Sequence, residues 1–172
     1  HLNVPISSAK VSKFADGEIS VMIGDNVRKE NCYIIQPTCI NYDNHTSVND
    51  SLMELLIMVD ALKRGSANNV IAVIPYYGYS RQDRKDYSRA PISAAVVAKC
   101  LEASNIDRLI VYDLHAGQIA GFFSNMCPLD NLYAEKYFKI YIETKIQTQY
   151  DNICIVAPDE GAVKTAFRTP TG

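Results

Sequence analysis

Three stretches of this chain predict helices, and in the clearest of them apolar residues recur every three or four positions. The strongest covers residues 45–65, where leucine and valine line one face and Gly65 ends the helix. A second helix is predicted over 91–105, with Pro91 in its first turn, where proline is well tolerated. A third, rich in tyrosine, is predicted from Leu132 to about residue 148.

Short continuous apolar runs separate these helices and predict strands covered on both faces. The runs are residues 31–37, 68–75, 108–113 and 152–157. Residues 10–24 differ, because two short strand patterns flank Gly17 and predict an N-terminal β-hairpin. Strands alternating with helices predict an α/β fold with a mainly parallel sheet flanked by helices.

Composition limits the classes of protein to which this chain can belong. Its 172 residues, 48% hydrophobic and 21% charged, suffice for one compact domain, and a net charge of −2 argues against a nucleic-acid binder. Five scattered cysteines favour reduced thiols in a cytoplasmic protein over disulfides or zinc. No apolar run reaches membrane-spanning length, so we expect no membrane partner, and both chain ends read as cut.

Polar residues follow three of the predicted strands. Arg81 and Gln82 lie in the loop after the strand at 68–75, Asp113 and His115 come after residues 108–112 of the next strand, and Asp159 follows the last strand. Ligands of parallel α/β sheets bind outside the carboxyl ends of the strands, so we expect the three clusters on one rim. Carboxylates suit Mg²⁺ and guanidinium suits phosphate, which together indicate a metal–polyphosphate site.

Each of these residues also has a plain structural interpretation. Asp113 could cap a helix, His115 could be a structural histidine, and the loop charges could be a solvated surface with internal ion pairs. The sequence contains no P-loop, no dinucleotide-binding glycine motif and no nucleophile elbow.

Five segments together resemble ribose-phosphate pyrophosphokinase, or phosphoribosyl pyrophosphate (PRPP) synthetase. They are FADGE (14–18), the run from 49 to 85 that ends in YSRQDRK, SRAPISAAVVAKCLE (88–102), DLHAGQIAGFF (113–123) and DNLYAE (130–135). The resemblance runs over nearly the whole chain, and the pairing of YSRQDRK with DLHAGQ is its most specific part.

The resemblance implies a reaction and a fold. Enzymes of this family transfer the diphosphoryl group of Mg-ATP to the 1-hydroxyl of ribose 5-phosphate, giving PRPP and AMP for nucleotide biosynthesis. The implied fold is phosphoribosyltransferase-like, and residues 1–172 are expected to be its N-terminal, ATP- and Mg-binding copy. The family's C-terminal domain, which binds ribose 5-phosphate, would lie beyond the chain. A homo-oligomer of dimers assembling to a hexamer is also implied.

The resemblance also assigns roles to residues. The implied ATP-binding residues are Arg81, Gln82, Asp83, Lys85 and Asp86, with Phe14, Asp16 and Glu18 from a neighbouring subunit. The implied metal residues are His115, Asp159 and Asp113, with Asp130 as a secondary one, and Ser88 and Arg89 resemble a regulatory region.

Departures from the family pattern leave alternatives open. Ser124 stands where an acidic residue is usual, the run to Asp130 is longer, and Ala162 replaces a glycine. The catalytic Lys and Arg of the family would lie downstream, so we expect this polypeptide alone to lack synthetase activity. The main alternative is a non-catalytic regulatory homologue; a phosphoribosyltransferase and a nucleic-acid module have weaker support.

Overall fold

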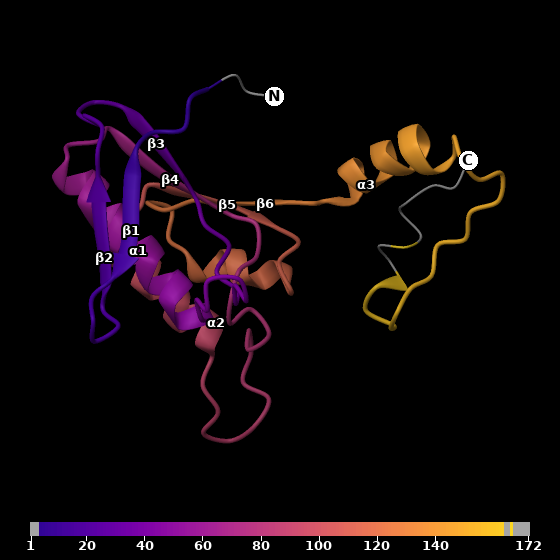
Figure 1. Cartoon of the computed structure of the whole chain (residues 1–172). Coiled ribbons are helices and arrows are strands. Elements are labelled where there is room, and N and C mark those ends of the chain that lie inside the picture. The colour runs from indigo at the N-terminus through magenta and orange to yellow at the C-terminus, as the bar shows by residue number, and fades with distance from the viewer. Residues whose placement is uncertain (1–3, 164–165, 167–172) are drawn as a thin grey trace. The chain divides into compact units, whose positions relative to one another are not determined.

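The computed structural model describes residues 4–163 and residue 166 (Figure 1). Its elements in chain order are β1 (Ala9–Lys13), β2 (Ile19–Ile23), β3 (Asn31–Ile35), α1 (Val48–Arg64), β4 (Asn69–Ile74), α2 (Ser93–Ala103), β5 (Arg108–Tyr112), the 3₁₀ helix η1 (Gly117–Phe122), β6 (Leu129–Leu132), α3 (Glu135–Tyr141) and the π-helix η2 (Ile142–Ile146). The chain forms two compact units, His1–Leu132 and Tyr133–Gly172.

The first unit is built on a four-stranded parallel sheet. The strand order is β3-β4-β5-β6, and every neighbouring pair is parallel. The predicted α/β fold with a parallel sheet and flanking helices is therefore confirmed. The sequence patterns had placed strands at β3, β4 and β5 but had not shown β6.

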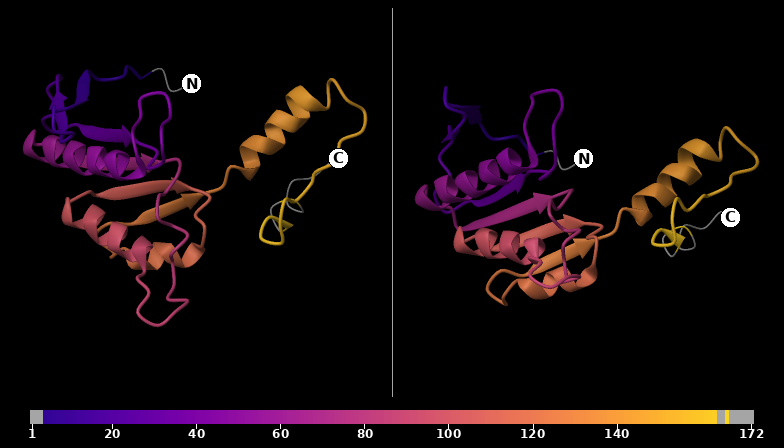
Figure 2. Two further views of the ribbon diagram at one scale, coloured as in Figure 1. Left: turned by 60° about the horizontal axis from the view of Figure 1, so that its bottom comes forward. Right: turned by 90° about the horizontal axis from the view of Figure 1, so that it is seen from below.

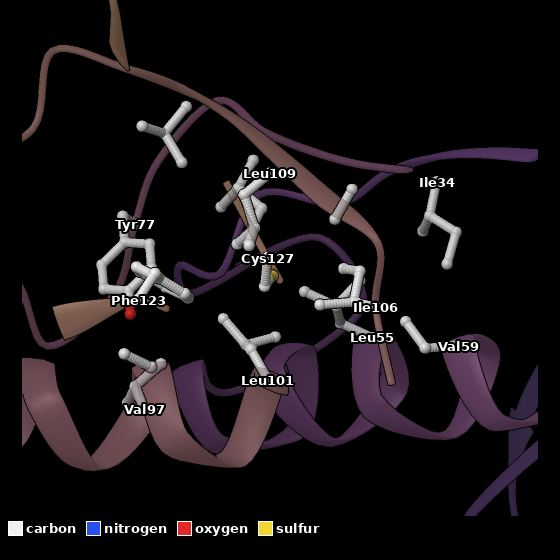
Figure 3. Packing of buried hydrophobic residues seen from close by; sticks show 14 of the residues in the cluster. Ile34, Leu55, Val59, Tyr77, Val97, Leu101, Ile106, Leu109, Phe123 and Cys127 are labelled. Carbon is white, nitrogen blue, oxygen red and sulfur yellow. The ribbon is translucent and has the colours of Figure 1, made fainter. Parts of the chain in front are cut away.

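Helices α1 and α2 lie on the same side of the sheet (Figures 1 and 2). The alternate residues Val70, Ala72 and Ile74 of β4 are fully buried against this layer, because side chains alternate between the two faces of a strand. Leu55 of α1 and Leu101 of α2 are also fully buried. Figure 3 shows how side chains from both helices meet those of the strands in one core.

The other face of the sheet carries apolar side chains that remain exposed in this unit. Tyr33 and Ile35 of β3 are 64% and 70% exposed, although their neighbours in the strand point into the core. On the same face, Arg108 Nε donates to Asp130 Oδ2 at 2.6 Å, across the β5–β6 pair.

Both ends of α1 carry the signals that fix a helix. The Ser47 hydroxyl accepts from the Asp50 N–H, and the Asp50 carboxylate accepts from the Ser47 N–H, which is a complete capping box. Gly65 closes the last turn. Helix α2 lacks a side-chain cap on Ile92 and begins at Ser93, so Pro91 lies just before the first turn rather than within it.

The N-terminal hairpin has the predicted form. Strands β1 and β2 pair antiparallel from Ala9↔Ile23 to Lys13↔Ile19. Gly17 adopts a φ of +95° in the turn, a conformation that a side chain would strain. We call residues 14–18 the hairpin turn.

The second unit departs from the sequence patterns. The predicted helix from Leu132 begins at Glu135 and becomes a π-helix at Ile142. The strand predicted at 152–157 is wrong, because these residues pair with no described strand. An apolar run does not form a strand without a hydrogen-bonding neighbour, and Val156 is exposed. Among the described residues, no helix has the length and apolarity needed to cross a membrane.

Candidate functional site

The loop that follows β4, residues 75–92, is the first part of the candidate site; we call it the β4 loop. Its start is fixed by Thr38, whose hydroxyl donates to the Tyr76 carbonyl at 2.9 Å and accepts from the Gly78 N–H at 2.7 Å. A Cβ on Gly78 would lie 2.5 Å from the Thr38 carbonyl oxygen, so only glycine fits this approach. The chain therefore leaves the sheet in one defined direction.

Tyr77 anchors the same loop in the core. Its side chain is 3% exposed, its hydroxyl donates to the Ala94 carbonyl at 3.3 Å, and its ring meets Phe123 edge-on with centroids 6.4 Å apart. Burial raises the pKa of the Tyr77 phenol well above its usual value. Tyr77 thus joins the loop to α2 and to the segment after β5.

Arg81 and Gln82 have different surroundings in the β4 loop. Arg81 is exposed, and within the described part of the chain its guanidinium takes part in none of the ion pairs. Gln82 instead serves the start of α2: its carbonyl accepts from the Ala94 N–H at 3.1 Å, and its side-chain oxygen accepts from the Ser93 hydroxyl. Gln82 thereby supplies the cap that Ile92 cannot.

Asp83 points inward and connects the β4 loop to the next one. Its side chain is 9% exposed, and its carboxylate accepts from the side-chain amide of Gln118 in η1. Gln118 belongs to the DLHAGQ segment, so this bond joins two of the three polar clusters predicted to share a rim. The remaining loop charges are exposed, and Arg84 pairs with Asp86 at 2.7 Å.

The second part of the site is the β5 loop, residues 113–116. Asp113 has a φ of 45° and donates its N–H to the Leu132 carbonyl at 2.9 Å, and the Leu114 N–H donates to the Asn131 side chain at 3.1 Å. His115 follows and is exposed. Strand β6 therefore holds the β5 loop through Asn131, a role that the sequence patterns did not reveal.

The hairpin turn is the third part. The Phe14 N–H donates to the Glu18 carbonyl at 2.8 Å, and the Asp16 carboxylate accepts from the Glu18 N–H at 3.2 Å. Phe14 is 59% exposed, and Asp16 and Glu18 are exposed as well. The turn presents one aromatic ring and two acidic side chains to solvent.

The predicted metal residues are divided between the two units of the chain. Asp159 belongs to the second unit, where its carboxylate accepts from the Ala162 N–H at 2.9 Å. Asp130 is paired with Arg108 on the open face of the sheet. In residues 4–163 and 166, no three His, Cys, Asp or Glu side chains form a group able to hold a metal. The roles of His115 and Asp113 at a metal stay predictions.

The structure also locates Ser124, which departs from the family pattern, and the exposed residues of the β4 loop. Ser124 donates its N–H to the Glu102 carboxylate at 2.6 Å, a bond that lowers the pKa of Glu102 and ties this turn to α2. Lys85, Ser88 and Arg89 are exposed in the β4 loop, and Arg89 has a φ of 64°. Neither observation tests a regulatory role.

Comparison with known proteins points in one direction. Residues 1–104 match the family model described as the N-terminal domain of ribose phosphate pyrophosphokinase. The chain is 50% identical over 166 residues to a ribose-phosphate pyrophosphokinase of Helicobacter pylori, and 52% identical over 165 residues to ribose-phosphate pyrophosphokinase A of Dictyostelium discoideum. Each alignment covers 96% of this chain and 49% of the relative, so the chain spans about half the length of these proteins.

The fold gives the same result. A crystal structure of phosphoribosylpyrophosphate synthetase from Mycobacterium smegmatis matches with a TM-score of 0.81 at 38% identity, covering 98% of this chain and 53% of that one. With the family model covering more than half of the residues, the chain belongs to the ribose-phosphate pyrophosphokinase family, of which it carries the N-terminal domain.

Proposed function

We propose that this chain forms the ATP-binding part of a ribose-phosphate diphosphokinase, which makes PRPP and AMP from ATP and ribose 5-phosphate. A bond forms between the 1-oxygen of the sugar and the β-phosphorus. The bond between that phosphorus and the oxygen shared with the α-phosphate breaks, AMP leaves with this oxygen, and the 1-hydroxyl loses its proton. One observation carries the proposal: the Asp83–Gln118 bond joins the β4 loop, which holds the exposed Arg81, to η1, which directly follows the exposed His115 loop.

Arg81 is the residue best suited to hold the phosphates. Transfer of a phosphoryl group depends on positioning and charge neutralisation more than on a strong base. An exposed guanidinium outside any ion pair can offer two parallel donors to phosphate oxygens. Lys85 adds a second exposed cation in the same loop, whereas Gln82 and Asp83 are engaged by Ser93 and Gln118 and support the loop from within.

The hairpin turn suits a purine base. The exposed Phe14 ring can stack on a base, and the acidic side chains of Asp16 and Glu18 can accept from an exocyclic amino group. We assign this turn to the adenine pocket of a neighbouring subunit, within a homo-oligomer of dimers assembled to a hexamer.

Mg²⁺ fits the donor set as a metal brought in by the nucleotide. It keeps several waters and is held by one or two carboxylates together with phosphate oxygens, and Asp113 and Asp159 supply carboxylates of this kind. His115, Asp113 and Asp159 would hold the Mg-ATP complex, in which the ion offsets phosphate charge. We place the protein in the cytoplasm, where both substrates are found, and assign Ser88 and Arg89 to regulation.

Calorimetry of ATP binding with and without Mg²⁺ tests this proposal. We expect binding that requires Mg²⁺ and that weakens at least about tenfold in Arg81→Ala, the loss expected for a hydrogen bond to a charged group. His115→Ala should also weaken this Mg²⁺-dependent binding. Equal affinity in all three proteins would refute the site.

Arg64→Ala is the matched control for the arginine change. Arg64 is exposed on α1 and pairs with Asp60 at 2.7 Å, away from the proposed site. Exposed i,i+4 pairs contribute little to stability, so this variant should bind ATP as the wild type does.

A further inference from the structure

The first turn of α1 contacts two separate segments of the candidate site. The Asn49 side-chain oxygen accepts from the Tyr79 hydroxyl, and the Asp50 carboxylate pairs with Lys13 Nζ at 2.9 Å. Tyr79 belongs to the β4 loop, and Lys13 ends β1. Two consecutive residues of one helix thus hold both segments.

The Lys13–Asp50 pair fixes the base of the hairpin turn. Lys13 directly precedes Phe14, whose N–H closes the turn. Asp50 is already held by the capping box, so its position follows that of the helix. The bond to Lys13, together with those to Ser47, lowers the pKa of Asp50 to about 2, so this anchor keeps its negative charge at neutral pH.

The Tyr79–Asn49 bond fixes the β4 loop at an unusual backbone position. Tyr79 has a φ of 63°, which is uncommon for a bulky side chain and persists only when its surroundings hold it. The bonds of Gly78 to Thr38 and of Tyr79 to Asn49 supply that hold. Two residues later the chain reaches Arg81, so the direction of the loop at Tyr79 determines where the guanidinium can go.

We infer that Asn49 and Asp50 are positioning residues, which make the first turn of α1 the common support for the phosphate-binding and base-binding segments. This inference rests on the proposed function. It predicts two separable defects: loss of the Tyr79 bond disturbs the hold on phosphates, and loss of the Lys13 pair disturbs the hold on the base.

Two ligands distinguish these defects: Mg-ATP, and Mg-triphosphate, which lacks a base. Tyr79→Phe should weaken both ligands equally, by about 3- to 10-fold, the range for one ordinary hydrogen bond. Lys13→Met should weaken ATP by a similar factor and leave triphosphate unchanged. Lys13→Arg keeps the ion pair and should bind ATP as the wild type does.

Matched controls lie close by. Lys10→Met is the control for Lys13→Met, because Lys10 is an exposed lysine on β1 outside the described ion pairs. Tyr87→Phe is the control for Tyr79→Phe, because Tyr87 lies in the β4 loop and is 80% exposed. Both should bind the two ligands normally. Thermal unfolding and light scattering on every variant would verify equal folding and one oligomeric state.

The outcomes separate this inference from the function on which it rests. If the wild-type chain binds neither ligand, the proposed function fails and the inference with it. If the wild type binds ATP but Lys13→Met and Tyr79→Phe do so equally well, only the inference is overturned. A loss of both ligands in Lys13→Met, or equal wild-type affinity for both ligands, would overturn its base-binding half. A Tyr79→Phe effect that persists undiminished in an Asn49→Ala background would overturn its phosphate-binding half.

Discussion

The Gln118 side-chain amide donates to the carboxylate of Asp83, and this bond joins the β4 loop to η1, two segments that follow neighbouring strands of the sheet. Asp83 is nearly buried, whereas the cations around it in sequence are exposed. Of the two carboxylates in this highly charged loop, Asp83 thus forms its bond inside the fold, and Asp86 faces solvent.

Changing Gln118→Glu should break this connection with almost no change in shape. Two carboxylates would then face each other in a partly buried place, and we expect a loss of about 1–3 kcal/mol in the free energy of unfolding. Urea unfolding at pH 7 measures it. Gln149→Glu, the same change on an exposed side chain in the second unit, should be neutral. Equal stability of the two variants would show that the Asp83–Gln118 bond contributes nothing.

Gly78→Ala should displace the start of the β4 loop, because the new methyl group would meet the Thr38 carbonyl. We expect a destabilisation of about 1–3 kcal/mol, as for other overpacked sites. Chemical denaturation measures it, with Gly121→Ala as the control, since a Cβ there meets nothing within 4 Å. If Gly78→Ala were as stable as the wild type, the start of the β4 loop could move away from the Thr38 carbonyl without loss of stability.

Acid should weaken the fold in part through Asp50. Its pKa is lowered to about 2 in the folded chain, first by the bond to Lys13. Stability from a lowered carboxyl pKa is complete above the unfolded value of about 3.9 and disappears as the pH falls through the folded one. Between pH 4 and about 2, Asp50→Asn should therefore lose less stability than the wild type. Unfolding free energies measured against pH that run parallel for the two proteins would contradict this prediction.

The cysteines should differ in reactivity. Cys100 and Cys154 are exposed, whereas Cys127 is 3% exposed and burial raises its pKa to about 11. Since the thiolate is the reactive form, iodoacetamide at pH 8 should label the exposed pair and reach Cys127 only after unfolding. Peptide mass spectrometry with and without urea gives the comparison, and early labelling of Cys127 would show that the core opens.

The Cys127 thiol should also make the folding stability fall at alkaline pH. A raised pKa means that the stabilisation is complete below the unfolded value of about 8.5 and is lost as the pH rises toward 11. Cys127→Ala should flatten the fall in stability over this range, although it lowers stability at neutral pH. If the stability of Cys127→Ala fell with pH as steeply as that of the wild type, Cys127 would not be the group responsible.

Much of the first unit could be predicted from sequence because local patterns and packing agree there. Helix α1 has its apolar face, its capping box and Gly65, and β4 is an apolar run covered by that helix. The strand predicted at 152–157 had only the apolar run. Pairing depends on a neighbour distant in sequence, which periodicity does not report.

The candidate site was predictable by residue type but not by orientation. The sequence indicated that Arg81 and His115 lie on one rim of the sheet, and the structure bonds the β4 loop of Arg81 to η1, which follows the β5 loop of His115. It could not indicate that Asp83 turns inward or that Gln82 caps α2, because both depend on partners elsewhere in the chain. Asn131 was missed for the same reason, since its strand is short and lacks an apolar run.

The parallel sheet also determines how the chain reaches this structure. Asn31 pairs with Asn69, and Ile71 pairs with Arg108, so an entire α-helix lies between the two strands of each of these pairs. Contacts between residues so far apart in sequence require loop closure before they yield any stabilisation, and this slows folding. The first unit is therefore expected to refold slowly, in milliseconds to seconds, with α1 the element able to form earliest from its own local signals.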